Sequence, residues 1–144
     1  VQDLQDWHRR WLGNIYPWAG ELRCVNLGKD GFFFAAAPQI PRLLVGFEKE
    51  CLTPFTPCHH SSDESLIRAI ALTHVEFILI HPFREGNGRL SRLLADVMAV
   101  QAGRPPLDYS VWEEHRDAYF AAINNGLNGQ FAPMEHWVRL ALLA

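Results

Sequence analysis

The sequence has few cysteines, little net charge and no long hydrophobic run, and each absence narrows what the chain can be. Its three cysteines among 144 residues are an odd number without a pairing pattern, which argues against a disulfide framework and favours a reducing, cytoplasmic setting. No apolar stretch approaches the roughly 20 residues that span a bilayer, so we expect no membrane partner. No basic segment followed by an apolar run opens the chain, so we expect no secretory signal.

The charge balance also argues against a nucleic-acid-binding protein. The net charge is −3, from 13 Lys and Arg against 16 Asp and Glu, and the arginines form no stripe. Affinity for nucleic acids comes from many cations that meet phosphates, so we expect no nucleic acid as a direct substrate. The chain is 49% hydrophobic and 12% aromatic, which is enough for one sizeable core. We therefore expect a single domain over residues 1–144.

Apolar residues at helical spacing dominate the chain and predict an all-α fold, a bundle of about six or more helices with one β-hairpin. The hairpin is expected from two strand-like stretches, 23–27 and 31–35, joined through the glycines of 28–31. Helices are expected over 4–12, 40–51, 63–80, 90–102, 110–125 and 133–143.

Several details of these helices can be predicted. The stretch 63–80 is apolar on most sides and should be central, and Pro82 should push His81 out of helical geometry. Ser110 with Glu113 is typical of a capping box. Four tryptophans share helical spacing with other apolar residues and are expected in the core: Trp7, Trp11, Trp112 and Trp137.

Residues 81–92 read His-Pro-Phe-Arg-Glu-Gly-Asn-Gly-Arg-Leu-Ser-Arg and carry most of the chemistry. Gly86 and Gly88 let the backbone approach a ligand and turn its N–H groups toward it. A helix begins at about this point, and its N-terminus favours an anion. Arg89 and Arg92 are three positions apart and lie on one helix face. Together these features predict a site for a polyphosphate.

Two more residues of this segment suggest a reaction as well as binding. A carboxylate beside phosphate, Glu85, makes sense as a ligand of Mg²⁺. His81 is the group here that can accept a proton near neutral pH. A base, a metal carboxylate and an anion cradle within twelve residues indicate phosphoryl or nucleotidyl transfer. The alternative is an ordinary loop with a histidine cap and a surface pair between Arg92 and Asp96.

The segment 81–92 resembles the signature of the Fic (Fic/Doc) family, HPFx(D/E)GNGRxxR, and matches it at every specified position. The resemblance extends over nearly the whole chain. Residues 16–23 look like the segment that leads into the family's flap, the hairpin at about 23–36 looks like the flap, and the helix over 65–80 looks like the one that delivers the signature. The resemblance implies the Fic fold and adenylylation, in which AMP moves from ATP to a hydroxyl of a target protein and pyrophosphate leaves.

The resemblance also implies roles for individual residues. His81 would be the base that deprotonates the target hydroxyl, and Glu85 would position Mg²⁺ on the α- and β-phosphates of ATP. Arg89 would reach the phosphates, and Arg92 would hold the γ-phosphate. The anion hole would be formed by Gly86, Asn87 and Gly88.

The expected hairpin is the candidate docking site for the target protein. An exposed strand edge is an aggregation hazard unless something pairs with it, and pairing by an extended peptide is a general way to dock. Alternation places Phe32 and Phe34 on one side and Phe33 on the other, although all three could instead cover the core. The docking residues are expected to be Lys29, Asp30, Gly31, Phe32, Phe33 and Phe34.

Two further features bear on the activity and its control. Doc-type kinases of the family have Lys where this chain has Gly88, so the resemblance favours AMP transfer over phosphorylation. Transfer of phosphate or of another nucleoside monophosphate is the alternative within the same chemistry. A non-catalytic nucleotide-binding regulatory module is a further alternative. The family's inhibitory pattern (S/T)xxxE(G/N) is absent, since the nearest match, 110–114, is followed by His115. We therefore expect a separate antitoxin-like partner, an inhibitory helix outside this sequence, or an unrestrained enzyme.

Overall fold

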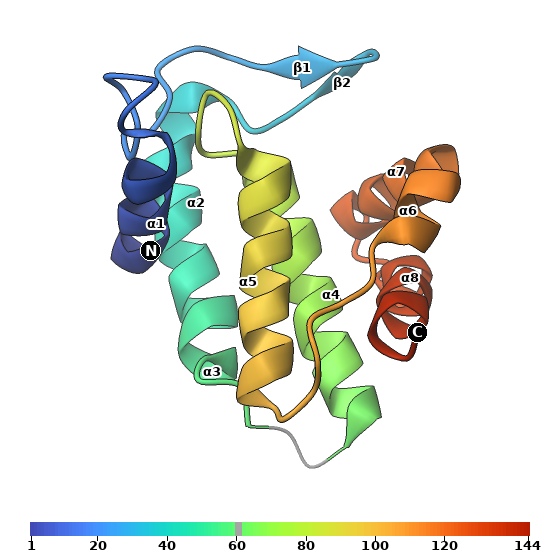
Figure 1. The fold of residues 1–144 in the computed structure, drawn as a ribbon. Coiled ribbons are helices and arrows are strands. Elements are labelled where there is room, and N and C mark those ends of the chain that lie inside the picture. The colour runs from blue at the N-terminus through green and yellow to red at the C-terminus, as the bar shows by residue number, and fades with distance from the viewer. Residues whose placement is uncertain (60–61) are drawn as a thin grey trace.

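The computed structural model describes residues 1–59 and 62–144 and has the expected helical fold, with a short hairpin across one end of the bundle (Figure 1). Within these residues no helix combines the length and apolar content needed to cross a bilayer. The elements in chain order are α1 (Gln2–Leu12), β1 (Gly28–Lys29), β2 (Phe32–Phe33), the 3₁₀ turn η1 (Ala37–Gln39), α2 (Ile40–Phe47), the π turn η2 (Glu48–Leu52), α3 (Thr53–Phe55), α4 (Asp63–Ile80), α5 (Asn87–Gln101), α6 (Ser110–Glu114), α7 (Arg116–Leu127) and α8 (Ala132–Leu142).

Helix α4 is the central element of the fold, as its apolar sequence predicts. It contacts α2, α5, α7 and α8 and is buried on most of its sides. Its first turn is capped by Ser62, whose hydroxyl accepts a hydrogen bond from the N–H of Ser65 at 3.2 Å. Its last turn ends at His81, which has φ 51° and ψ 62° because Pro82 disfavours the helical conformation there. The chain therefore turns sharply between α4 and α5, beneath the hairpin (Figure 1).

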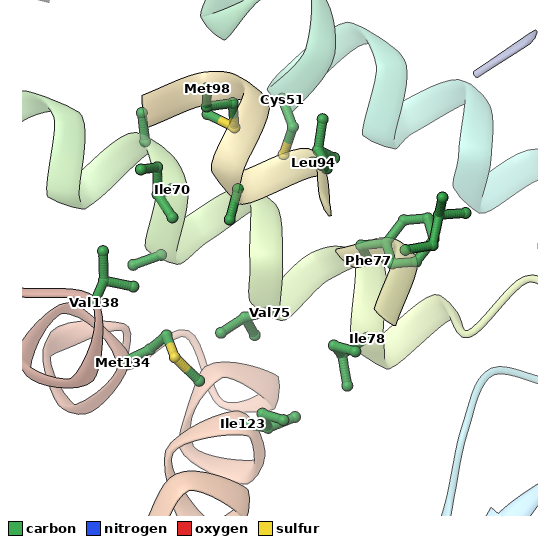
Figure 2. Packing of buried hydrophobic residues seen from close by; sticks show 14 of the residues in the cluster. Cys51, Ile70, Val75, Phe77, Ile78, Leu94, Met98, Ile123, Met134 and Val138 are labelled. Atoms are coloured by element: carbon green, nitrogen blue, oxygen red, sulfur yellow. The ribbon is translucent and has the colours of Figure 1, made fainter. Parts of the chain in front are cut away.

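The core is built around α4 and fixes the position of α7. Figure 2 shows α4 side chains such as Ile70 and Val75 between side chains of α5 on one side and of α7 and α8 on the other. Gly126 of α7 lies so close to α4 that an added Cβ would stand 2.3 Å from Cγ1 of Val75. Any larger side chain at this position would push α7 away, so the glycine is what allows the two helices to pack closely.

The hairpin is shorter than expected, and its turn has a different position. β1 pairs antiparallel with β2, with Gly28 opposite Phe33 and Lys29 opposite Phe32. Asp30 and Gly31 form the two-residue turn, with φ 51° and 80°, as in the type I′ turns that suit hairpins. The expected strand over 23–27 is wrong, because Arg23 ties this stretch to the end of α4 instead of leaving it free to pair.

Arg23 is buried and anchors the hairpin. Its guanidinium donates hydrogen bonds to the carbonyls of His81 (2.6 Å), Ile80 (3.1 Å), Val25 (2.7 Å) and Ala35 (2.6 Å). Burial lowers the pKa of Arg23 from its usual value. The four carbonyls come from both ends of the hairpin segment and from the end of α4, so this one side chain holds the hairpin over His81.

The C-terminal helices differ from expectation in two ways. The predicted helix over 110–125 is divided at His115, which has φ −123° and ψ 47°, into α6 and α7. The capping box is also wrong, because the carboxylate of Asp108 accepts hydrogen bonds from both the N–H (3.0 Å) and the hydroxyl (2.6 Å) of Ser110. Glu113, which the box would use, instead forms an ion pair with Arg92.

Three of the four tryptophans lie in or against the core, and one does not. Trp112 is buried, and Trp7 and Trp137 pack against the core with partly exposed rings. Trp11 is 39% exposed, so the expectation of a core position is wrong. Its helical spacing is real, but at the end of α1 this face of the helix meets the loop between α4 and α5 instead of the core.

Candidate active site

A cleft of about 780 Å³ opens between the hairpin, the start of α5 and the face of α6 and α7. It brings together residues that the sequence places far apart, from Leu27 to Asn124. Five predicted residues of the segment 81–92 line it: His81, Gly86, Gly88, Arg89 and Arg92. Four predicted hairpin residues also line it: Lys29, Asp30, Phe32 and Phe34.

His81 is held in one orientation by its two neighbours. Its Nδ1 lies 3.2 Å from the carbonyl of Ile78. Because a carbonyl can only accept, Nδ1 carries the proton and donates a hydrogen bond to the carbonyl. The unprotonated Nε2 is then the basic atom. The ring stacks on Phe34 of the hairpin, with centroids 3.7 Å apart. Burial lowers the pKa of His81 to about 4, and Arg23 and Lys29 act in the same direction, so the ring is neutral at pH 7 and can accept a proton.

Gly86 and Gly88 form the start of α5 in different ways. Gly86 has φ 83° and an added Cβ would lie 2.6 Å from the ring of Trp11, so neither its backbone angles nor its surroundings suit another residue. Gly88 has ordinary backbone angles, and an added Cβ would meet nothing within 4 Å. The fold does not need a glycine at 88, and the open space above it faces the cleft.

Asn87, the first residue of α5, is buried against the preceding loop and does not line the cleft. Its side-chain oxygen accepts a hydrogen bond from the N–H of Phe83 at 2.9 Å, and its side-chain nitrogen donates to the carbonyl of Phe83 at 2.7 Å. The side chain thus closes the loop that precedes α5. Only the backbone of Asn87, in the first turn of the helix, is available to an anion.

Glu85 is exposed and also lies outside the lining of the cleft. The hydroxyl of Tyr16 donates a 2.7 Å hydrogen bond to one of its carboxylate oxygens, Oε2. Among the residues that the structure describes, no group of three or more His, Cys, Asp or Glu side chains could hold a metal ion. A lone carboxylate fits Mg²⁺ if phosphate oxygens and water complete its ligands, which is the usual arrangement for this ion with nucleotides.

The two arginines of the segment rest on aromatic rings from other elements. The guanidinium carbon of Arg89 lies 4.8 Å from the centre of the Trp11 ring, and that of Arg92 lies 5.0 Å from the centre of the Tyr109 ring. Arg92 also forms an ion pair with Glu113, at 2.7 Å.

The alternative pair between Arg92 and Asp96 does not form. Asp96 instead accepts hydrogen bonds from the hydroxyl of Tyr109 (2.8 Å) and the N–H of Leu107 (3.0 Å). Arg92 is therefore free of its helix neighbour and faces the cleft.

Helix α7 supplies the wall opposite α5. Tyr119 and Asn124 line the cleft, and the ammonium group of Lys29 lies 4.8 Å above the ring of Phe120, so the tip of the hairpin touches this wall. The hydroxyl of Tyr119 lies 2.6 Å from Nε2 of His74. Burial lowers the pKa of His74 to about 3, so this histidine is a neutral packing residue behind the wall.

Of the remaining hairpin residues, Gly31 and Phe33 do not line the cleft. The alternation of the phenylalanines is confirmed, since the rings of Phe32 and Phe34 contact each other at 5.4 Å on the cleft side while Phe33 is 79% exposed. Both residues of β1 and Phe33 of β2 are exposed and thus remain accessible at the hairpin.

Sequence reasoning misses the site roles of four residues: Trp11, Tyr16, Arg23 and Glu113. Tyr16 and Arg23 lie in the segment 16–23 that resembles the lead into the flap, but the sequence assigns no role to either. Trp11 is expected in the core and Glu113 in a capping box. An aromatic residue before the cleft and a lone arginine carry no spacing signal that would separate them from ordinary core or surface residues.

Comparisons with known proteins identify the family and the fold. The sequence model described as "Fic/DOC family" matches residues 1–99. The chain is 31% identical to "Protein adenylyltransferase Fic" of Nematostella vectensis over 96% of its own length, but it spans only 31% of that relative. It matches the N-terminal FIC domain of Bep8 from Bartonella sp. 1-1C with a TM-score of 0.82 and 21% identity, over 98% of this chain and 72% of the other. It also matches BepC of Bartonella tribocorum, solved with bound AMPPNP, with a TM-score of 0.80 and 23% identity, over 97% of this chain and 72% of the other.

Proposed function

Because the chain belongs to the Fic/DOC family, we propose that it is a protein adenylyltransferase that moves AMP from ATP to a hydroxyl group of a target protein. The observation that carries this proposal is the shared cleft, in which a neutral imidazole faces the same space as two glycines and two arginines at the start of a helix. Binding alone would not need a base held in its neutral form. The combination suits transfer of a phosphate-containing group.

The start of α5 binds the phosphates in this proposal. Backbone N–H groups at the first turn of α5 and the positive end of its dipole attract the phosphate chain, and the open space above Gly88 admits it. Arg89 contacts the phosphates and Arg92 takes the γ-phosphate. The base of the nucleotide would then lie against the wall formed by Tyr119 and Asn124 of α7.

His81 performs the proton transfer. The oxygen of the target hydroxyl attacks the α-phosphorus of ATP and gives its proton to Nε2 of His81. A new bond forms between this oxygen and the α-phosphorus, and the bond from the α-phosphorus to the oxygen that bridges to the β-phosphate breaks. Pyrophosphate leaves with the electron pair of that bond. The hydrogen bond from Nδ1 to the carbonyl of Ile78 keeps Nε2 aimed at the acceptor throughout.

Glu85 would hold Mg²⁺ at the edge of this site, together with phosphate oxygens. The ion would neutralise part of the charge that develops on the phosphates. Tyr16 binds Oε2 of Glu85 and leaves Oε1 free, which fixes the direction in which the carboxylate presents its second oxygen. The side chain of Asn87 contributes by holding the loop in shape.

The target protein would dock on the hairpin. Support comes from the exposure of Phe33 and of both residues of β1, beside which an extended peptide could pair. The docking segment includes Lys29, Asp30 and Gly31 at the turn and continues through Phe32, Phe33 and Phe34. Because Phe34 stacks on His81, a peptide bound along the hairpin would pass close to the base.

We also propose that the protein acts in the cytoplasm and is restrained by a small antitoxin-like partner. The three cysteines are free thiols, two of them buried, which suits a reducing compartment. Arg92 already forms an ion pair with the carboxylate of Glu113. Its guanidinium could therefore bind an acidic side chain of a partner in the place of the γ-phosphate.

The experiment that tests the proposal is transfer of label from ATP to protein. The purified chain is incubated in a cell lysate with Mg²⁺ and ATP labelled at either the α- or the γ-phosphate. Relative to the lysate alone, whose own kinases use γ-labelled ATP, we expect the chain to add label from α-labelled ATP only, and a loss of about 10²- to 10⁴-fold of this added label in the His81→Ala variant. The matched control is His136→Ala, on the exposed surface of α8, which should retain full transfer. Added label from γ-labelled ATP above that of the lysate alone, or nucleotide binding without any transfer, would contradict the proposal.

A further inference from the structure

Trp11 is a large aromatic residue that the core does not use. It stands in the last turn of α1 and is 39% exposed, although its neighbour Leu12 is buried. A tryptophan at the surface of a helix end loses part of the benefit of burying its ring. Two of its contacts are with the phosphate-binding segment at the start of α5.

The first relation is with the backbone of Gly86. An added Cβ on Gly86 would lie 2.6 Å from Cζ3 and 3.0 Å from Cη2 of the Trp11 ring, so the ring covers this glycine directly. Gly86 has φ 83° and caps α5. The ring therefore limits how far this residue can move, at the point where the N–H groups of the helix start turn toward the cleft.

The second relation is with Arg89. Its guanidinium carbon lies 4.8 Å from the centre of the Trp11 ring, within the range of a cation–π interaction. No hydrogen bond or salt bridge to Arg89 is found among the described residues, in contrast to Arg92, which is paired with Glu113. The aromatic face attracts the guanidinium but does not occupy its N–H donors, which lie in the plane of the group and remain free for phosphate oxygens.

Trp11 itself is fixed from behind by His8. The two rings meet edge to face, with centroids 6.2 Å apart. His8 is buried, accepts a hydrogen bond from the N–H of Gly20 at Nδ1 (2.8 Å), and lies with Nε2 2.9 Å from the carbonyl of Glu85. Because a carbonyl can only accept, Nε2 carries the proton and donates to it. Both nitrogens are used, so the ring that supports Trp11 cannot rotate without breaking a hydrogen bond.

We propose that Trp11 is a positioning residue of the nucleotide site, which holds Arg89 in the phosphate-binding arrangement before the nucleotide arrives. This inference rests on the proposed function. A carboxylate in the place of Trp11 would also hold Arg89, but the phosphate would have to displace it. An aromatic ring pre-orients the cation without that competition.

The test is a double-mutant cycle measured by the binding of AMPPNP and Mg²⁺ in a calorimeter. We expect Trp11→Leu to weaken binding roughly 3- to 30-fold, the range of one cation–π contact, and Trp11→Phe to retain most of the affinity. Arg89→Ala should weaken binding further, and the effect of Trp11→Leu should largely vanish in that background. A role in packing alone would not produce this coupling, because it would act equally with and without Arg89.

The matched control is Trp137→Leu, which removes a partly exposed indole from α8, outside the cleft. It should leave the affinity unchanged whatever it does to the melting temperature. If Trp11→Leu binds AMPPNP as tightly as the wild-type protein, or if its effect and that of Arg89→Ala are additive, the role of Trp11 is overturned and the proposed function is untouched. Failure of the wild-type protein to bind AMPPNP would overturn the proposed function and, with it, this inference.

Discussion

Gly86 and Gly88 are two positions apart, but the structure needs only one of them for folding. Gly86 has a left-handed backbone and the Trp11 ring against it, so a methyl group there would meet strain and a clash. Gly88 is in the first turn of α5 with open space where a Cβ would stand. Because a helix favours Ala over Gly, the glycine at 88 weakens the fold slightly and must be explained by what approaches it.

Substitution by alanine separates these two uses. Gly88→Ala should leave the free energy of unfolding unchanged or raise it by up to about 1 kcal/mol, yet weaken AMPPNP binding about tenfold because the methyl group enters the phosphate space. Gly86→Ala should instead lower the free energy of unfolding by about 1–3 kcal/mol. Urea denaturation and calorimetry measure the two quantities. Equal nucleotide affinity in Gly88→Ala and wild type would show that phosphate does not approach this residue.

At the scale of elements, the hairpin depends on a single buried side chain. Only two residue pairs join β1 to β2, which is too little for a stable hairpin on its own. The backbone N–H of Ala35 reaches the carbonyl of Leu79 at 3.1 Å, and Arg23 supplies the other links to the end of α4. The position of the hairpin above His81 therefore follows from Arg23 more than from strand pairing.

Arg23→Met keeps an unbranched, largely apolar side chain, which is shorter than that of arginine, and removes the hydrogen-bond donors. We expect it to lower the free energy of unfolding by about 3 kcal/mol, because buried carbonyls lose charged hydrogen bonds. Amide hydrogen exchange at Phe34 and Ala35 should also speed up, since both N–H groups donate within the anchored segment. Arg42→Met, an exposed change on α2, is the control and should alter neither measurement. Unchanged exchange in Arg23→Met would show that the hairpin is anchored by other contacts.

The contact between α5 and α6 places a negative charge where the γ-phosphate is proposed to bind. Glu113 is half-exposed, so its ion pair with Arg92 contributes little to stability. The guanidinium next to it lowers the pKa of Glu113, which keeps the carboxylate charged. ATP must then compete with this carboxylate for Arg92.

Neutralising that carboxylate should therefore favour the nucleotide. Glu113→Gln is expected to lower the KM for ATP about threefold while kcat changes little, since a like charge near the phosphate is removed. Steady-state transfer kinetics measure both constants, with Glu114→Gln, the exposed neighbour, as the control. A higher KM in Glu113→Gln would mean that Glu113 orients Arg92 for the phosphate and does not compete with it.

The sequence predicts the elements better than the contacts between them. Apolar spacing finds α4 and α5, and Pro82 locates the turn at His81, because these depend on local geometry and on burial. The cap by Asp108 depends on which of several polar neighbours forms the hydrogen bond with Ser110, so the sequence suggests Ser110 and Glu113 instead. No local pattern marks the break at His115. The exposure of Trp11 depends on where α1 meets the loop before α5, which no local pattern encodes.

At the scale of the whole molecule, the site exists because distant segments meet around the C-terminal end of α4. The hairpin, the start of α5 and the wall of α7 all converge on that end, with α1 to one side of the loop (Figure 1). Three histidines lie in or next to this junction, and each is kept neutral by burial. The pKa of His74 is lowered to about 3 and that of His81 to about 4, and the pKa of His8 is lowered as well.

These histidines make the stability of the molecule depend on pH. The ordinary pKa of histidine is 6.5. Below this pH these histidines bind protons in the unfolded chain but stay neutral in the folded protein, so the free energy of unfolding falls as the pH falls. His74 and His81 each contribute up to about 1.4 kcal/mol per pH unit between about pH 6.5 and 5. His74→Gln should lower the free energy of unfolding at pH 7. It should also reduce the dependence of this free energy on pH by the contribution of one histidine, as measured by urea denaturation at several pH values. A slope identical to that of the wild type would show that His74 takes up its proton as readily in the folded protein as in the unfolded chain.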